Sequence, residues 1–146
     1  MRRFIVPIAT FAVVVAATGH EALAAVTSKT YEFKADVKLE TGVDIGQGLK
    51  LDSILFKSPS SIGMKIFSSG ILKVDVAVTN LGAEARRFGI VVALFDDDGR
   101  LLGVASHGTT FPLKTGRQAV YTLDFLNVNS EIFKATKFKI SVEPKL

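Results

Sequence analysis

The 146-residue chain contains no cysteine and no tryptophan, only two tyrosines, and only two histidines. Without cysteine, disulfides, thiolate metal sites and a lipid-modified N-terminal cysteine are all excluded. No apolar run after residue 17 approaches the roughly 20 residues that a membrane-spanning helix needs. These absences exclude a disulfide-stapled scaffold and leave a chain that must be held together by an ordinary hydrophobic core.

The first 24 residues have the order of a secretory signal peptide. Two arginines follow the initiator methionine, an uncharged apolar stretch runs from Phe4 to Ala17, and Ala22-Leu23-Ala24 is a small-x-small cleavage site. We predict cleavage after Ala24, with Ala25 as the alternative, and a mature domain of residues 25–146. An uncleaved signal anchor is the other interpretation of this segment.

The predicted mature chain is mildly basic. Removing residues 1–24 takes away two arginines and one glutamate, which leaves 16 basic and 13 acidic residues and lowers the net charge from +4 to +3. The lysines alternate along expected strands and do not form the concentrated patch of a nucleic-acid-binding protein, so no nucleic-acid partner is expected. Exported eukaryotic domains of this size often carry disulfides, so their absence favours a bacterial periplasmic or secreted protein.

Apolar and polar residues alternate with a period of two, which is typical of strands with one face on a core. The expected strands are residues 31–40, 49–56, 72–79, 87–95, 100–106, 118–125 and 137–142. The expected connections are residues 41–48, 57–70, 96–99 and 112–116, with one short helical turn within residues 127–135. A phase slip near Ser53 indicates a bulge, and Pro144 is expected to end the last strand.

About seven short strands without a sustained helical pattern predict an all-β fold. We expect an immunoglobulin-like antiparallel sandwich that follows a cleaved signal peptide. An outer-membrane barrel would instead show girdles of tryptophan and tyrosine, which this chain lacks.

Residues 72–125 carry a recurring order of turn elements. One strand ends in Val78-Thr79-Asn80-Leu81-Gly82, the next ends in Ala93-Leu94-Phe95-Asp96, and a turn at Asp98-Gly99 follows. Pro112-Leu113-Lys114-Thr115-Gly116 then precedes a strand that ends in Asp124-Phe125. This order resembles the small bacterial immunoglobulin-like domains of the FxLYD type, although Phe95 stands where that family has tyrosine. The resemblance implies a sandwich and no enzymatic activity, and it transfers no binding residues.

Two polar features suggest chemistry. Asp96-Asp97-Asp98 before Gly99 offers oxygen ligands for Ca²⁺, but it lacks the alternate spacing and distant glutamate of a calcium loop, so we interpret it as a hairpin turn. His107, the only histidine of the mature chain, could pair with a serine or a carboxylate in a small hydrolase. No glycine-flanked serine elbow accompanies it, and we expect a structural or exposed histidine, no catalytic residues, no metal site and no cofactor.

The strand at residues 87–95 is apolar on both faces. One face holds Phe88, Ile90, Val92 and Leu94, and the other holds Val91, Ala93 and Phe95. A sandwich strand needs only one apolar face, so something must cover the second. We expect Val91 and Phe95 to be buried under residues 57–70, and otherwise the second face is a partner surface.

Three functions follow from these observations. The first is an exported, non-enzymatic domain that binds or scaffolds, with another protein or a second copy of itself as partner. The second is a small hydrolase based on His107, and the third is a cation-binding module at Asp96–Asp98. A buried serine or carboxylate beside His107 would favour the hydrolase, and carboxylates aimed at one point would favour the cation module.

Overall fold

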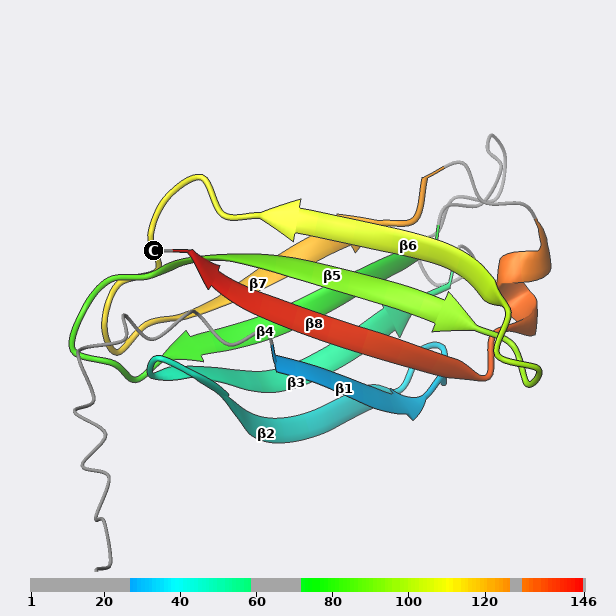
Figure 1. The fold of residues 1–146 in the computed structure, drawn as a ribbon, viewed down its shortest axis with the longest axis horizontal. Coiled ribbons are helices and arrows are strands. Elements are labelled where there is room, and N and C mark those ends of the chain that lie inside the picture. The colour runs from blue at the N-terminus through cyan, green and yellow to red at the C-terminus, as the bar shows by residue number, and fades with distance from the viewer. Residues whose placement is uncertain (1–26, 59–71, 127–129, 146) are drawn as a thin grey trace, which may run out of the picture.

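The computed structural model describes residues 27–58, 72–126 and 130–145, which form two antiparallel sheets of four strands each (Figure 1). The elements in chain order are β1 Thr27–Glu32, β2 Lys38–Gly46, β3 Leu49–Lys57, β4 Lys73–Asn80, β5 Arg87–Phe95, β6 Leu101–Gly108, β7 Gln118–Asp124, the 3₁₀ helix η1 Ser130–Lys134, and β8 Lys137–Lys145. The predicted all-β sandwich is confirmed, with eight strands in place of about seven. The predicted signal peptide lies outside the described residues.

The strand order is β1-β8-β5-β6 in the first sheet and β2-β3-β4-β7 in the second. Strand β4 pairs with β7 and β5 pairs with β8, while the chain crosses between sheets from β4 to β5 and from β7 to β8. In an immunoglobulin-like sandwich, strands B, C, E and F pair and cross between sheets in the same way as β4, β5, β7 and β8 do here. Four strands lie at sheet edges, namely β1 and β6 in the first sheet and β2 and β7 in the second.

No helix among the described residues is long and apolar enough to cross a membrane.

The core lies between the sheets and is built from alternate residues of each strand. In β5 the buried side chains are the predicted set, Phe88, Ile90, Val92 and Leu94, and in β8 they include Phe138, Ile140 and Val142. They face β4, where Val74, Val76 and Val78 are fully buried. Burial of each such side chain contributes roughly 1.5–3 kcal/mol, so this interface accounts for the main driving force of folding.

The prediction of one strand over residues 31–40 is wrong. The chain leaves the first sheet after β1 and enters the second at β2, and Asp36 between them has a φ of 58°. The Asp36 carboxylate accepts hydrogen bonds from the Ser58 amide at 3.0 Å and the Ser58 hydroxyl at 2.6 Å. These two hydrogen bonds offset the cost of a left-handed conformation, which aspartate tolerates better than most residues.

Two predicted strand ends are also corrected. Residues 41–46 belong to β2 and are not a connection, because pairing with β3 continues to Gly46 through two register shifts, one between Glu40 and Val43 and one between Asp44 and Gly46. Gly42 and Gly46 adopt the positive φ of these irregular positions. Pro144 lies inside β8, opposite Phe88. The backbone amide and carbonyl of Phe88 both bond to Thr109, on the side away from β8. Phe88 and Pro144 therefore form a non-hydrogen-bonded pair, in which the missing amide of proline costs no ladder bond. The bulge expected near Ser53 is confirmed by a register shift between Leu51 and Ser53.

Candidate interaction site

The outer face of β5 is only partly covered. Register places Val91, Ala93 and Phe95 beside Ser106, Val104 and Leu101 of β6. Val91 is 42% exposed, Val104 46% and Leu101 54%, whereas Ala93 and Phe95 are partly buried. The expectation that Val91 is buried within the chain is therefore wrong. Most of its expected cover, residues 57–70, lies outside the described residues. We call Val91, Ala93, Phe95, Leu101 and Val104 the apolar face.

The outer face of the second sheet has a different character, because its charges are paired. Lys57 contacts Asp75 at 2.5 Å, and Lys73 contacts Asp124 at 3.4 Å. Asp52 accepts hydrogen bonds from Thr79 at 2.5 Å and from Gln118 at 2.9 Å, and Lys50 lies 3.4 Å away. Burial raises the pKa of Asp52, but these hydrogen bonds and the lysine charge outweigh burial and hold the pKa below its usual value. This face is internally satisfied and needs no partner.

Strand β6 is the least protected of the four edge strands. Proteins block exposed edges with charged side chains, proline or bulges, because an open edge invites pairing with another chain. The charged residues at the other edges are Lys29 and Glu32 in β1, Lys38, Glu40 and Asp44 in β2, and Asp124 in β7. Strand β6 has neither a charged residue nor a proline, and its one register shift against β5 lies near its first residue.

The free side of β6 carries backbone groups that can pair. The Thr109 amide donates to the Phe88 carbonyl at 2.9 Å, so His107 and Ala105 also face β5 in the alternating ladder. The amides and carbonyls of Val104 and Ser106 therefore point to the free side. Figure 1 shows β6 as the last strand of its sheet on that side.

A groove of about 460 Å³ lies beside the end of β6, and its lining is aromatic and cationic. The rings of His107 and Tyr121 lie 5.4 Å apart, and Tyr121 packs edge-on against Phe88 at 5.3 Å. Burial raises the pKa of Tyr121. The groove's two cations are Lys114 and Arg117, which are exposed and form no ion pair with any described residue.

The groove does not assemble the pair that a hydrolase would need. Neither serine nor carboxylate belongs to its described lining. Ser106 lies on the opposite face of β6 from His107, since successive side chains alternate. The Thr109 hydroxyl is buried and already accepts a bond from the Phe88 amide at 2.9 Å. In the described structure, the contact that the His107 ring makes is a tilted one with the ring of Tyr121.

Of the three aspartates in the turn, Asp96 is the one whose side chain bonds to Arg100. Its carboxylate accepts the Arg100 amide at 2.8 Å and the Arg100 Nε–H at 3.1 Å, and Arg100 reaches Glu131 at 3.2 Å. The hydrogen bond from the Arg100 amide, with help from its guanidinium, outweighs desolvation and holds the pKa of Asp96 below its usual value. Asp97 and Asp98 are exposed. Within residues 27–58, 72–126 and 130–145, no three acidic or histidine side chains are grouped to hold a metal ion.

Asn80 was expected only to end a strand, yet it organises the loops beside the groove. Its buried side-chain amide donates to the carbonyls of Glu84 at 2.7 Å and Leu113 at 2.8 Å, and its side-chain oxygen accepts the Gly82 amide at 2.9 Å. The Asn80 carbonyl also accepts the Gly116 amide at 2.7 Å. One polar side chain thus fixes the segment that carries Lys114.

A smaller apolar cavity of about 270 Å³ lies between β1 and β2, floored by Ile54, Phe56 and Phe138. Lys34 and Glu32 at its rim are 3.2 Å apart and pair with each other. The Tyr31 hydroxyl is buried beside it and has no hydrogen-bond partner among the described residues, and burial raises the pKa of Tyr31.

Comparison with known proteins gives no family assignment, because no protein-family model matches the chain and no curated protein matches it. Function must therefore be argued from the surfaces themselves. Of these, the β6 edge and the adjoining apolar face combine an uncharged edge strand with exposed apolar side chains.

Proposed function

We propose that the protein is an exported, non-enzymatic binding domain that receives a strand of a protein partner along β6. Export is supported by the signal-peptide pattern of residues 1–24, which favours a periplasmic or secreted location. The observation that carries the proposal is the uncharged edge of β6 beside an exposed apolar face. The resemblance to FxLYD-type domains implies a sandwich and adds no site residue.

Strand addition uses both features at once. Main-chain hydrogen bonds to the free groups of Val104 and Ser106 would supply affinity, and side chains of the added strand would cover the apolar face. Each hydrogen bond contributes about 0.5–1.5 kcal/mol net, and burial of apolar surface contributes about 25 cal/mol per Å². The polar outer face of the second sheet offers no comparable gain, because its charged groups already have partners.

Site-specific photocrosslinking tests this proposal in cells that express the full chain. A benzophenone amino acid replaces Val104 on β6 or, as a matched control, Val120 on the outer face of the edge strand β7. Both valines are exposed, at 46% and 59% respectively, so neither substitution should disturb the core. We expect a discrete protein adduct from position 104 and none from position 120. Absence of an adduct at 104, or equal adducts at both positions, would contradict the proposal.

A further inference from the structure

We infer that the strand added to β6 is β6 of a second copy, so that two first sheets join into one continuous eight-stranded sheet. This inference rests on the proposed function and goes further by naming the partner. One end of β6 carries exposed acidic side chains and the other end carries exposed basic ones. Two copies of β6 are therefore complementary in charge when they run antiparallel and not when they run parallel.

The edge permits a twofold pairing. Strand β6 has eight residues and spans about 27 Å at roughly 3.4 Å per residue. In an antiparallel pair about a twofold axis near Val104 and Ala105, the outward groups of one copy face the outward groups of the other. The exposed side chains of Val104 then lie close to the axis, and the apolar faces of the two copies become continuous.

The charges select this antiparallel arrangement. The turn that precedes β6 carries Asp97 and Asp98, and the groove that follows it carries Lys114 and Arg117. All four side chains are exposed, and none forms an ion pair with a described residue. Antiparallel pairing brings the start of one β6 to the end of the other, so each acidic turn approaches the cationic groove of the second copy.

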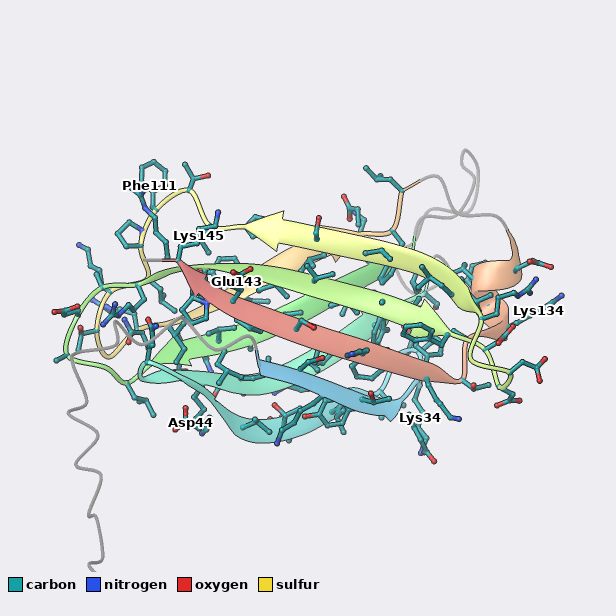
Figure 2. The ribbon with its side chains drawn as sticks, in the orientation of Figure 1. Lys34, Asp44, Phe111, Lys134, Glu143 and Lys145 are labelled. Carbon is teal, nitrogen blue, oxygen red and sulfur yellow. The ribbon has the colours of Figure 1, made fainter. Side chains whose placement is uncertain are left out.

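A parallel pairing would place turn beside turn and groove beside groove, with like charges together. Such juxtapositions disfavour association, whereas complementary ones steer it and fix register. An acidic strand from another protein could match the groove, but this chain itself supplies both halves of the match. Figure 2 shows Phe111 projecting from the loop after β6, at the end where the second copy's turn would arrive.

Charge reversal tests the pairing with purified exported protein in sedimentation equilibrium. We expect the unmodified protein to dimerise with a dissociation constant that rises with salt, because exposed charges are screened within about 8 Å at physiological ionic strength. The variant Asp97→Lys/Asp98→Lys and the variant Lys114→Glu/Arg117→Glu should each dimerise at least about tenfold more weakly. Mixed together, the two variants should form a heterodimer, because both turn-to-groove contacts are again between opposite charges.

A second pair of variants tests the edge itself. Val104→Lys places two lysines near the twofold axis and should abolish dimerisation, whereas the matched Val120→Lys on β7 should leave it unchanged. Both positions are exposed, so the melting temperature of each variant should stay close to that of the unmodified protein.

The outcomes separate the two proposals. A protein that stays monomeric at high concentration, or a dimer that neither Val104→Lys nor charge reversal weakens, would overturn the inference. If position 104 then crosslinks only to a different protein, the binding function stands and the self-pairing fails. If position 104 crosslinks to nothing and the protein is monomeric, both fail.

Discussion

Replacement of Asn80 by alanine should be the most damaging polar substitution in the described structure. The side chain is fully buried and makes three hydrogen bonds, to the Glu84 carbonyl, the Leu113 carbonyl and the Gly82 amide. Each bond contributes about 0.5–1.5 kcal/mol net, and a buried group left without a partner costs more. The Leu113 bond is the most buried of the three, so we expect a loss of about 2–4 kcal/mol in the free energy of unfolding.

Chemical denaturation with urea measures this loss directly, since the transition midpoint falls while its slope stays constant. A domain of this size should lose roughly 8–15 °C in melting temperature. The control is Thr122→Ala, which removes an exposed 2.7 Å bond to Asp75 and should cost at most about 0.5 kcal/mol. If Asn80→Ala cost no more than this control, the idea that Asn80 holds the loops beside the groove would be refuted.

Four other predictions concern separate parts of the chain. Tyr31→Phe should raise the free energy of unfolding by about 1 kcal/mol, because it removes a buried hydroxyl that has no partner in the described part of the chain, and a loss in urea denaturation would show that the hydroxyl is bonded. The lowered pKa of Asp52 means that its stabilisation is present above the unfolded pKa of about 3.9 and is lost as pH falls through the folded value. Asp52→Asn should therefore flatten the acid limb of stability against pH, and an unchanged limb would count against this reasoning. Asp97→Asn should change stability by about 0.5 kcal/mol at most, and millimolar Ca²⁺ should leave the melting temperature unmoved, whereas a calcium-dependent rise would reveal a cation site. Mass spectrometry of the exported protein should find an N-terminus at Ala25 or Val26, and an intact Met1 would contradict cleavage.

The sequence predicted those strands whose apolar alternation is uninterrupted and whose ends carry turn residues. Strand β5 begins and ends at the predicted residues, and Gly99 adopts the positive φ expected of the aspartate turn. The same alternation failed at residues 31–40, because Phe33 and Val37 keep the period of two across the break between β1 and β2. The left-handed Asp36, held by Ser58 from 22 positions away, lies between the two strands where the chain passes from one sheet to the other. A long-range contact of this kind leaves no local signal.

The candidate site could be predicted only in part. The two apolar faces of β5 were visible in the sequence, and the structure places one of them in the core and leaves the other partly exposed. The exposure of Val91 depends on which residues the strand order places beside it, namely Ser106 on β6 and Ser141 on β8, whose side chains are both short. Likewise, the composition of β6 acquires meaning only once the strand order places β6 at an edge, because an uncharged strand in the middle of a sheet would be ordinary.

The contrast among the four edges is the strongest reason to assign β6 a partner. The same chain places several charged side chains on β1 and β2 and one at the end of β7, and none on β6. An open β6 beside exposed Leu101 and Val104 would expose the free protein to uncontrolled sheet-to-sheet association at high concentration. A closed twofold dimer removes this hazard, because each edge satisfies the other and no further edge of this kind remains. Val104→Lys should therefore yield a monomer that resists aggregation, while Lys114→Glu/Arg117→Glu, which weakens the dimer and keeps the edge open, should aggregate faster than the unmodified protein. Light scattering during prolonged incubation compares the two, and equal aggregation of both variants would argue that the β6 edge is not paired in the native protein.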